Sequence, residues 1–418
     1  MITSFNSSLH LSPSAPTLSP SFWKNPSQKR DLAERTVSNF LMAPNSRLEK
    51  ESEAKETSPK IKQTRPFLTY YFLNPMPKDR DLAVIQLARV ALEHFKSSGQ
   101  THVIEYRGCF YMAHYPCRKR VSVIQMTGRG TSRLGGGTFG TVYQTTELVS
   151  QTALAMKIPN PNFSRKLFKR EYDITKQIRD KDQFLLFFSV PFSTKRFIFF
   201  TQSLQDQDLF TFLNAAAPQS LSWADRLQGC RQLLLDYFNI YDKGVCHTDL
   251  KPENVLIRKK KKGELDLQIG DFGSAISHQY RPEKMEVAYN GYESMQDAYS
   301  LEEASTQKQF DAFFRRCRRR DMFALGVTLL ELLIGRTLPL QAQKEWISDN
   351  RKKGILVSAL KLFEQTAPPL YQPISPLLLE MTLMNPYLRP SWEDLRTRSN
   401  LLFSKFNTDK FYEEEICI

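Results

Sequence analysis

The feature of this sequence that most constrains its fold is the run HTDLKPEN at residues 247–254, which is followed by an Asp-Phe-Gly that begins at Asp271. The run places Asp249, a carboxylate able to accept a proton, two positions before Lys251. Asn254 and Asp271 add two oxygen ligands of the kind that hard divalent cations prefer. An isolated His-x-Asp carries little weight, but the whole constellation predicts acid–base chemistry beside a bound metal ion.

The constellation resembles the catalytic loop H-R-D-L-K-P-E-N of protein kinases, from which it differs only at Thr248, and the D-F-G segment that follows that loop. The resemblance implies an α+β, bilobal protein-kinase-like fold with a β-rich small lobe and a helical large lobe. It also implies ATP-dependent phosphorylation of Ser/Thr hydroxyls on protein substrates, because a lysine at the position of Lys251 accompanies Ser/Thr specificity. Asp249 would then be the base, and Lys251 would neutralise charge on the transferred phosphoryl group. Asn254 and Asp271 would hold Mg²⁺.

A glycine-rich stretch upstream, LGGGTFGTV at residues 134–142, fits the kinase pattern G-x-G-x-x-G-x-V. Glycines let the backbone approach phosphate oxygens closely and also permit positive φ angles. Taken alone, the stretch is equally typical of a flexible hairpin. The resemblance implies that the nucleotide is contacted by Leu134, Gly135, Gly137, Gly140, Val142, Ala155, Lys157 and Glu171.

Lys157 interrupts the apolar segment 153–158, which resembles the V-A-I-K strand whose lysine holds the α- and β-phosphates. A lysine in a buried strand is costly unless it is paired, so an acidic partner is expected. The segment 169–178 has apolar residues at helical spacing and resembles helix αC. Glu171 stands at the position of the pairing glutamate, whereas the competing Asp173 lies on another face of the helix.

Thr248 stands where most members of the family have an arginine. In many kinases a phosphate on the activation segment neutralises that arginine and orders the segment. Threonine supplies no charge for such a contact. We therefore expect activity that does not depend on phosphorylation between Asp271 and Glu293.

The A-P-E signature of the family is degraded in this sequence. One register aligns Glu293 with the glutamate of that signature, and a second register uses residues 294–296 and loses the glutamate. In the family this glutamate pairs with an arginine in the last third of the domain, a place that Arg389 fits. The first register therefore predicts a structural ion pair between Glu293 and Arg389.

Periodicity and resemblance together divide the chain into a disordered or targeting tail (1–65), a small α+β extension (66–120), a kinase domain (121–405) and a C-terminal tail (406–418). Within the domain, Thr201 aligns with the gatekeeper and residues 202–204 with the hinge that contacts adenine. The strands are expected over 121–126, 131–134, 142–146, 153–158, 185–190 and 196–201, and the helices over 208–214, 223–243 and 321–333.

The first thirty residues contain no Asp or Glu and are rich in Ser, Thr and Pro. They have no continuous apolar segment, which argues against a secretory signal peptide. Such a composition is typical of a plain disordered tail, an organelle transit peptide or a bacterial export signal. In the extension, an apolar stripe over 79–96 predicts a helix, and residues 102–115 predict a hairpin. We expect the extension to dock on the small lobe as a packing unit, with a binding module as the alternative.

The net charge of +14 is concentrated in two basic runs, 258–262 and 315–320. Solvated loops are the simplest interpretation of both runs. An acidic protein partner, an anionic membrane surface and a nuclear import signal are sharper alternatives. Binding of nucleic acid is not expected, because no aromatic residues are interleaved with the charges.

The six cysteines show no C-x-x-C spacing, which favours a reducing compartment and argues against structural zinc. The apolar run 321–333 is too short to span a membrane. A cytoplasmic protein is therefore expected, with export or organelle targeting through the N-terminal tail as the alternative.

Two other functions compete with an active Ser/Thr protein kinase. A pseudokinase-type scaffold usually loses the lysine, the base or a metal ligand, yet Lys157, Asp249, Asn254 and Asp271 are all present. A small-molecule kinase of related fold would keep the base and the metal ligands. The residues 251–253 and the intact glycine-rich stretch favour protein substrates over that possibility.

Overall fold

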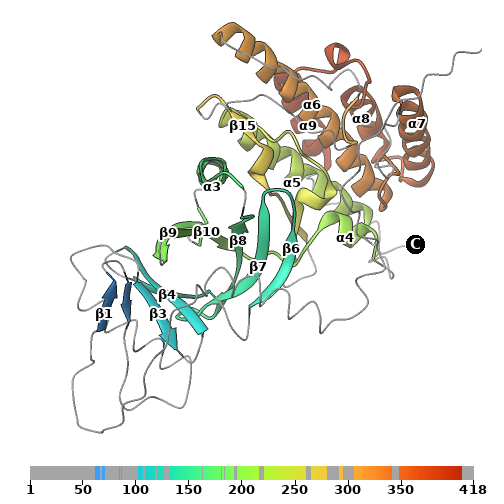
Figure 1. Cartoon of the computed structure of the whole chain (residues 1–418). Coiled ribbons are helices and arrows are strands. Elements are labelled where there is room, and N and C mark those ends of the chain that lie inside the picture. Colours follow the sequence, from blue (N-terminus) through green and yellow to red (C-terminus); the bar gives the residue numbers. More distant parts are fainter. Residues whose placement is uncertain are drawn as a thin grey trace, which may run out of the picture.

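A computed structural model shows a β-rich small lobe beside a helical large lobe, the two-lobed α+β fold of protein kinases (Figure 1). The residues that the structure describes are 62–65, 68–70, 84, 86, 102–106, 109–117, 120–126, 131–161, 163–179, 181–182, 184–192, 195–215, 221–259, 265–279, 291–294, 306–340 and 348–406.

The small lobe is built on an eight-stranded sheet. Seven of its strands have the order β3-β4-β5-β7-β8-β10-β9, and the eighth, β6, pairs with β7. Strand β7 alternates buried and partly exposed side chains, because one face of the sheet covers a core and the other does not. All six strands predicted for the domain lie where the sequence places them: β5 (Arg120–Gln125), β6 (Ser132–Gly136), β7 (Gly140–Glu147), β8 (Thr152–Pro159), β9 (Leu186–Phe192) and β10 (Lys195–Ser203).

The N-terminal extension continues this sheet. Its strands β3 (His102–Tyr106) and β4 (Cys109–Cys117) form the predicted hairpin, and β4 pairs with β5, the first strand predicted for the domain. Strand β5 pairs with β7 where Ile124 faces Glu147, and the buried Glu147 Oε1 accepts a hydrogen bond of 2.9 Å from the Val123 N–H. The boundary placed between residues 120 and 121 therefore falls inside β5.

Other predictions for the N-terminal region lie mostly outside the described residues. Of the tail at 1–65, the structure describes β1 (Lys62–Arg65), which pairs with β2 (Leu68–Tyr70). Of the helix over 79–96, it describes Val84 and Gln86, which are both helical. Of the segment 406–418, it describes Phe406 alone.

Helix α3 (Arg165–Ile178) packs against both lobes. Its Phe168 and Tyr172 rings contact Phe200 of β10, with ring centroids 5.2 and 6.0 Å apart. On another side, Ile174 and Ile178 join the core of the large lobe. The helix therefore lies in a position where movement of one lobe against the other would disturb it.

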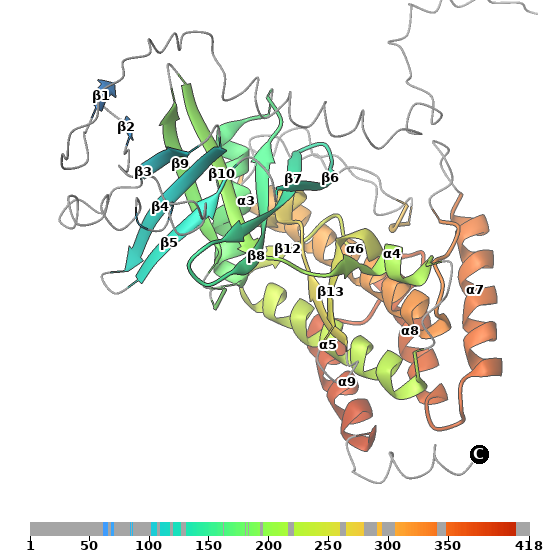
Figure 2. The ribbon, with the colours of Figure 1, turned by 90° about the horizontal axis from the view of Figure 1, so that it is seen from below.

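The large lobe surrounds helix α6 (Gln307–Ile334) (Figure 2). Every residue of this helix from Asp321 to Leu333 is buried. Around it lie α4 (Leu209–Leu213), α5 (Trp223–Asp242), α7 (Asp349–Thr366), α8 (Ser375–Met381) and α9 (Trp392–Phe406). Short strands pair beside the helices: β11 (Gln207–Asp208) with β13 (Val255–Lys259), β13 with β14 (Leu265–Ile269), and β12 (Val245–Cys246) with β15 (Ile276–Ser277). Among the described helices, none combines the length and the apolar character that a membrane crossing requires.

Helix α6 begins fourteen residues earlier than the predicted start at Asp321, so the expectation of a solvated loop over 315–320 is wrong. A capping box of Thr306 and Gln309 starts the helix. Its first half buries Phe310, Phe313, Phe314 and Cys317 in one cluster with Cys246 and Ile276. Three arginines of the basic run make contacts inside the lobe: Arg318 donates to Tyr241 O, Arg319 to Pro386 O and Arg320 to Glu293 Oε2.

Candidate functional site

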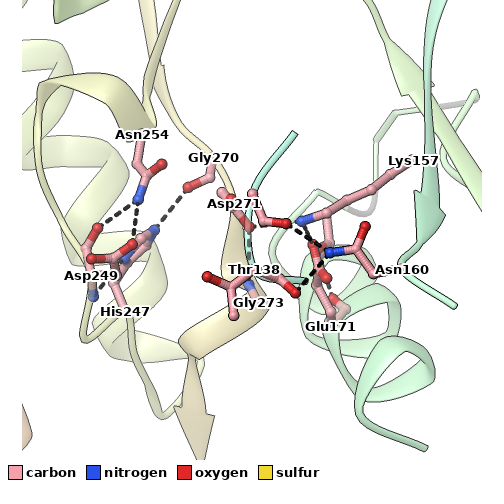
Figure 3. Close-up of polar contacts among 12 residues, drawn as sticks. Thr138, Lys157, Asn160, Glu171, His247, Asp249, Asn254, Gly270, Asp271 and Gly273 are labelled. Atoms are coloured by element: carbon pink, nitrogen blue, oxygen red, sulfur yellow. Dashed lines mark hydrogen bonds and ion pairs between the residues drawn. The ribbon is translucent and has the colours of Figure 1, made fainter. Parts of the chain in front are cut away.

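Three charged side chains from different elements meet at the small-lobe side of the site (Figure 3). Lys157 Nζ on β8 lies 2.5 Å from Glu171 Oε1 on α3 and 2.9 Å from Asp271 Oδ1. Asp173 forms its ion pair with Lys169, one helical turn away. The structure thus gives Lys157 the partner that the sequence favoured.

Burial and the neighbouring charges together decide the ionisation of these three side chains. Burial lowers the pKa of Lys157, but the charges of Asp271 and Glu171 outweigh that effect, and the net shift is upward. The Glu171 side chain is only 2% exposed, and this burial raises its pKa to about 7. The positive charge of Lys157 lowers the pKa but offsets only part of the effect of burial. Loss of water around the carboxylate raises the pKa of Asp271. Lys157 and the Gly273 N–H lower this pKa by more than that, so the net shift is downward. With 44% of its side chain exposed, Asp271 is an accessible anion.

Asp321 of α6 fixes the backbone of the loop that holds the predicted base. Its fully buried carboxylate accepts hydrogen bonds from the N–H groups of His247, at 2.6 Å, and Thr248, at 2.8 Å. The Tyr237 hydroxyl donates to the same carboxylate at 2.5 Å. Thr248 has a φ of 62°, a strained value for a β-branched residue, and these bonds hold it there.

The predicted base, Asp249, lies between two side chains of its own loop. Lys251 Nζ is 3.1 Å from Asp249 Oδ2. Asn254 Nδ2 donates to Asp249 O at 2.7 Å and to Asp249 Oδ2 at 3.0 Å. Because the amide nitrogen of Asn254 is directed at Asp249, the amide oxygen is the atom left to bind a cation.

The segment of Asp271 is held on its large-lobe side by His247. The Nε2 atom of the buried His247 ring lies 2.8 Å from Gly270 O. This contact gives His247 a structural role in supporting the loop. Asp271 has a φ of 56° and accepts a hydrogen bond of 3.3 Å from Gly273 N. Figure 3 shows Asp271 between the Asp249–Asn254 pair on one side and the Lys157–Glu171 pair on the other.

The glycine-rich stretch forms the turn between β6 and β7. A Cβ on Gly140 would lie 2.4 Å from Ile158 O, so this position needs a glycine because of a close backbone approach. A Cβ on Gly135 or Gly137 would meet no atom within 4 Å, so packing does not require a glycine at either position. The described glycines of the stretch have no positive φ, so that part of the sequence argument does not apply.

Asn160 fastens the tip of this turn. Its Nδ2 donates to Gly137 O at 2.8 Å and to Thr138 O at 3.0 Å. Phe139, at the same tip, packs against Phe163 with ring centroids 5.4 Å apart. The remaining predicted nucleotide contacts lie along the same strands: Leu134 is exposed, Val142 pairs with Lys157 across β7 and β8, and Ala155 is buried.

The predicted gatekeeper and hinge lie at the end of β10. Thr201 is fully buried and its hydroxyl donates to Phe184 O at 2.8 Å. Asp182 accepts hydrogen bonds of 2.9 Å from both the N–H and the hydroxyl of Ser203. These bonds fix the backbone of the hinge segment.

The ion pair between Glu293 and Arg389 stays a prediction, and the structure adds a partner that the sequence did not indicate. Glu293 Oε2 lies 3.3 Å from Arg320 Nη2, and Arg389 Nη2 donates to Ser294 Oγ at 3.3 Å. Tyr292, the residue before Glu293, donates to Glu331 of α6. Glu293 is fully buried, and α6 brings Arg320 to it because the helix begins earlier than predicted.

Several residues that hold the site were not singled out from the sequence. Two of them, Asn160 and Asp182, bond backbone groups that are distant in the chain. The third, Arg179, forms an ion pair with a distant side chain, Asp236. No motif marks them. The early start of α6 did carry a signal, because Phe310, Phe313, Phe314 and Cys317 follow the spacing of a helix.

Comparison with known proteins agrees with this geometry. The sequence model described as the protein kinase domain matches residues 129–399, more than half of the chain. CBL-interacting serine/threonine-protein kinase 18 of Arabidopsis thaliana is 28% identical over 208 residues, which cover 48% of this chain and 37% of that protein. Calcium/calmodulin-dependent protein kinase type I of Schizosaccharomyces pombe is 29% identical over 231 residues, which cover 53% and 61%. The chain thus spans less than two thirds of the length of these relatives.

Proposed function

The chain belongs to the protein kinase family, and we propose that it transfers the terminal phosphoryl group of ATP to Ser and Thr hydroxyls of protein substrates. The observation that carries this proposal is the convergence of Lys157, Glu171 and Asp271 beside the Asp249–Asn254 pair. Both relatives are named protein kinases, and one is named a serine/threonine-protein kinase. These names and the lysine at position 251 favour protein Ser/Thr hydroxyls as acceptors.

In the proposed reaction, Asp249 accepts the proton of the substrate hydroxyl as its oxygen attacks the terminal phosphorus. The bond between that phosphorus and the bridging oxygen breaks, and ADP leaves with the electron pair. Lys251 lies 3.1 Å from Asp249 and can offset charge on the transferred group. Lys157, kept protonated by its two carboxylates, binds the α- and β-phosphates and is held in place by Glu171.

The residues present fit Mg²⁺ that is shared with ATP. Among the described residues, no group of three or more His, Cys, Asp or Glu side chains forms a site that would hold a metal by itself. Asp271 offers an exposed carboxylate and Asn254 an amide oxygen, and Mg²⁺ commonly takes one or two protein ligands of this kind and the rest from phosphates and water. When bound, the ion would neutralise charge on the phosphate oxygens.

Thr248 supports activity without a phosphorylated activation segment. Its hydroxyl donates to Ser274 O at 2.8 Å, three residues after Asp271. A neutral contact therefore holds the beginning of the segment that a phosphate–arginine contact orders in many kinases.

Product analysis tests the proposed function. The purified chain is incubated with labelled ATP, Mg²⁺ and a generic basic protein, alongside the Asp249→Ala variant. Label on serine and threonine of the protein, made by the parent and not by the variant, is the expected result. Label on a small molecule alone would assign the chain to small-molecule kinases. Absence of transfer under every condition would assign it to scaffolds.

An anionic partner is a secondary proposal that rests on the run 258–262. Arg258 and Lys259 are exposed at the end of β13, and residues 260–262 lie outside the described part of the chain. Heparin retention tests this surface. Charge reversal at Arg258 and Lys259 should lower the salt concentration needed for elution, because exposed charges are screened at high salt. An unchanged elution profile would leave only a solvated loop.

A further inference from the structure

Arg179, at the C-terminal end of α3, forms a two-pronged ion pair with Asp236 of α5. Its Nη1 lies 2.5 Å from Asp236 Oδ1 and its Nη2 2.6 Å from Asp236 Oδ2. The two side chains are only 13% and 14% exposed, so bulk water screens the pair weakly. Paired N–H···O bonds of this kind fix the relative orientation of the two groups as well as their distance.

The same guanidinium reaches the strand that leads to Asp271. Arg179 Nη2 donates to Ile269 O at 2.5 Å, and Asp236 Oδ2 accepts from Ile269 N at 2.8 Å. Both backbone groups of Ile269 are therefore held by the pair, two residues before Asp271. The guanidinium carbon also lies 5.9 Å from the centre of the Phe272 ring, within the range of a cation–π contact.

Two weaker contacts join the same end of α3 to the large lobe. Gln177 Nε2 donates to Lys243 O at 3.0 Å, and Asn239 Nδ2 donates to Ile178 O at 3.4 Å. Glu171 lies on the same continuous helix, about 12 Å from Arg179 at the rise of an α-helix. Fixing the C-terminal end of α3 therefore restricts where Glu171 can point.

We propose that Arg179 is a positioning residue for phosphoryl transfer. It fixes Glu171, through α3, and Asp271, through Ile269 and Phe272, to the same helix α5. The proposal rests on the proposed function, since it assigns Arg179 a role in that reaction. Because Thr248 offers no cation to a phosphorylated segment, contacts inside the domain set the positions of the two carboxylates around Lys157.

The contacts with Asp236 and Ile269 require an arginine at position 179. A guanidinium presents several N–H donors in a fixed plane and can bind both oxygens of Asp236 and Ile269 O at once. A lysine keeps the charge but cannot reproduce this fork. Arg179→Lys therefore separates orientation from charge.

Two variants and one control make the test. Arg179→Lys keeps a cation opposite Asp236. Arg179→Met combined with Asp236→Leu removes both charges and leaves neither unpaired, so it carries the test if the lysine variant does not fold. The control is Arg396→Ala, which removes an ion pair of 2.7 Å with Asp242 on the same helix α5, a more exposed pair to which α3 contributes neither partner.

The readouts are kcat, the ATP dissociation constant and amide hydrogen exchange of α3 and residues 271–273, measured on the full chain. Measured at a temperature where both Arg179 variants remain folded, they should lose at least about tenfold in kcat, and their exchange should accelerate in both segments. The control should stay within about twofold of the parent in kcat, with unchanged exchange.

Two results would overturn the positioning role: folded Arg179 variants that keep kcat within about twofold of the parent, or unchanged exchange in both segments. A parent chain without any phosphoryl transfer would refute the proposed function instead, and with it a role in that reaction. The exchange data would then still decide whether Arg179 fixes α3 and the Asp271 segment.

Discussion

Lys157 Nζ lies 2.9 Å from Asp271 Oδ1, although 114 positions separate the two residues in the chain. The small lobe supplies the lysine and the large lobe the aspartate, so the contact exists only when the lobes face each other. Glu171 completes the group from α3 at 2.5 Å. A buried ammonium, a buried carboxylate and an exposed carboxylate thus meet at the junction of the lobes.

Glu171→Gln should lower kcat/KM for ATP by about a hundredfold, the loss typical of removing one preorganised electrostatic contact. Asp173→Asn is the matched control. It breaks an ion pair with the half-exposed Lys169 on the surface of the same helix, and such pairs contribute little. Steady-state kinetics at several ATP concentrations measures both variants. Equal effects of the two changes would contradict the assignment of Glu171.

The raised pKa of Glu171, about 7 against an ordinary value of 4.5, makes two pH predictions. Because the folded-state value is raised, protonated Glu171 stabilises the fold; this contribution is complete below pH 4.5 and is lost as the pH rises through about 7. The ion pair with Lys157 needs the ionised carboxylate, so kcat/KM for ATP should rise over the same pH range.

Comparison of pH profiles checks this prediction. The parent should show a rise in kcat/KM centred near pH 7, and Glu171→Gln should lack it. The same rise in the variant would assign the titration to another group.

Phosphorylation of the activation segment should be dispensable. Between Asp271 and Glu293 the hydroxyl residues are Ser274, Ser277, Tyr280, Tyr289 and Tyr292. Ser277 and Tyr292 are buried, so they are kept for folding. The variant with Ser274→Ala, Tyr280→Phe and Tyr289→Phe should retain basal turnover. A loss of about a hundredfold, as large as the loss of a general base, would contradict this account of Thr248.

Two alanine substitutions in the glycine-rich stretch should have different effects. Gly140→Ala should lower the melting temperature, because its Cβ would lie 2.4 Å from Ile158 O and the backbone would have to move. Gly137→Ala meets open space, so it should leave the melting temperature unchanged and weaken ATP binding. Thermal unfolding and nucleotide titration separate the two. A stable Gly140→Ala would contradict the close approach.

The strands of the small lobe could be predicted from the sequence, and so could the meeting of Lys157, Glu171 and Asp271, because each is marked by a local pattern. Alternation marks β7, helical spacing marks α3, and fixed spacing marks residues 247–254 and 271–273. These patterns can be detected within a window of a few residues.

Contacts between distant segments could not be predicted in this way. Arg179 and Asp236 are 57 positions apart, and neither lies in a recognisable motif. The sequence predicts a solvated loop over 315–320 for another reason, namely that five of the six residues are arginines. The buried helix face of Phe310, Phe313 and Phe314 nevertheless continues into the run at Cys317. The same early start brings Arg320 of the helix to Glu293, a contact that the sequence did not indicate.

The most direct test of the central claim is single-turnover phosphoryl transfer by Asp249→Ala beside the parent, with the ATP dissociation constant measured on both. Asn254 donates to the backbone oxygen of Asp249 as well as to its carboxylate, so the loop should keep its shape in the variant. The transfer rate should fall by about 10²–10⁴-fold, the contribution of a positioned base, while the dissociation constant changes by less than about threefold. A variant that keeps the transfer rate within about twofold of the parent would contradict the role of Asp249.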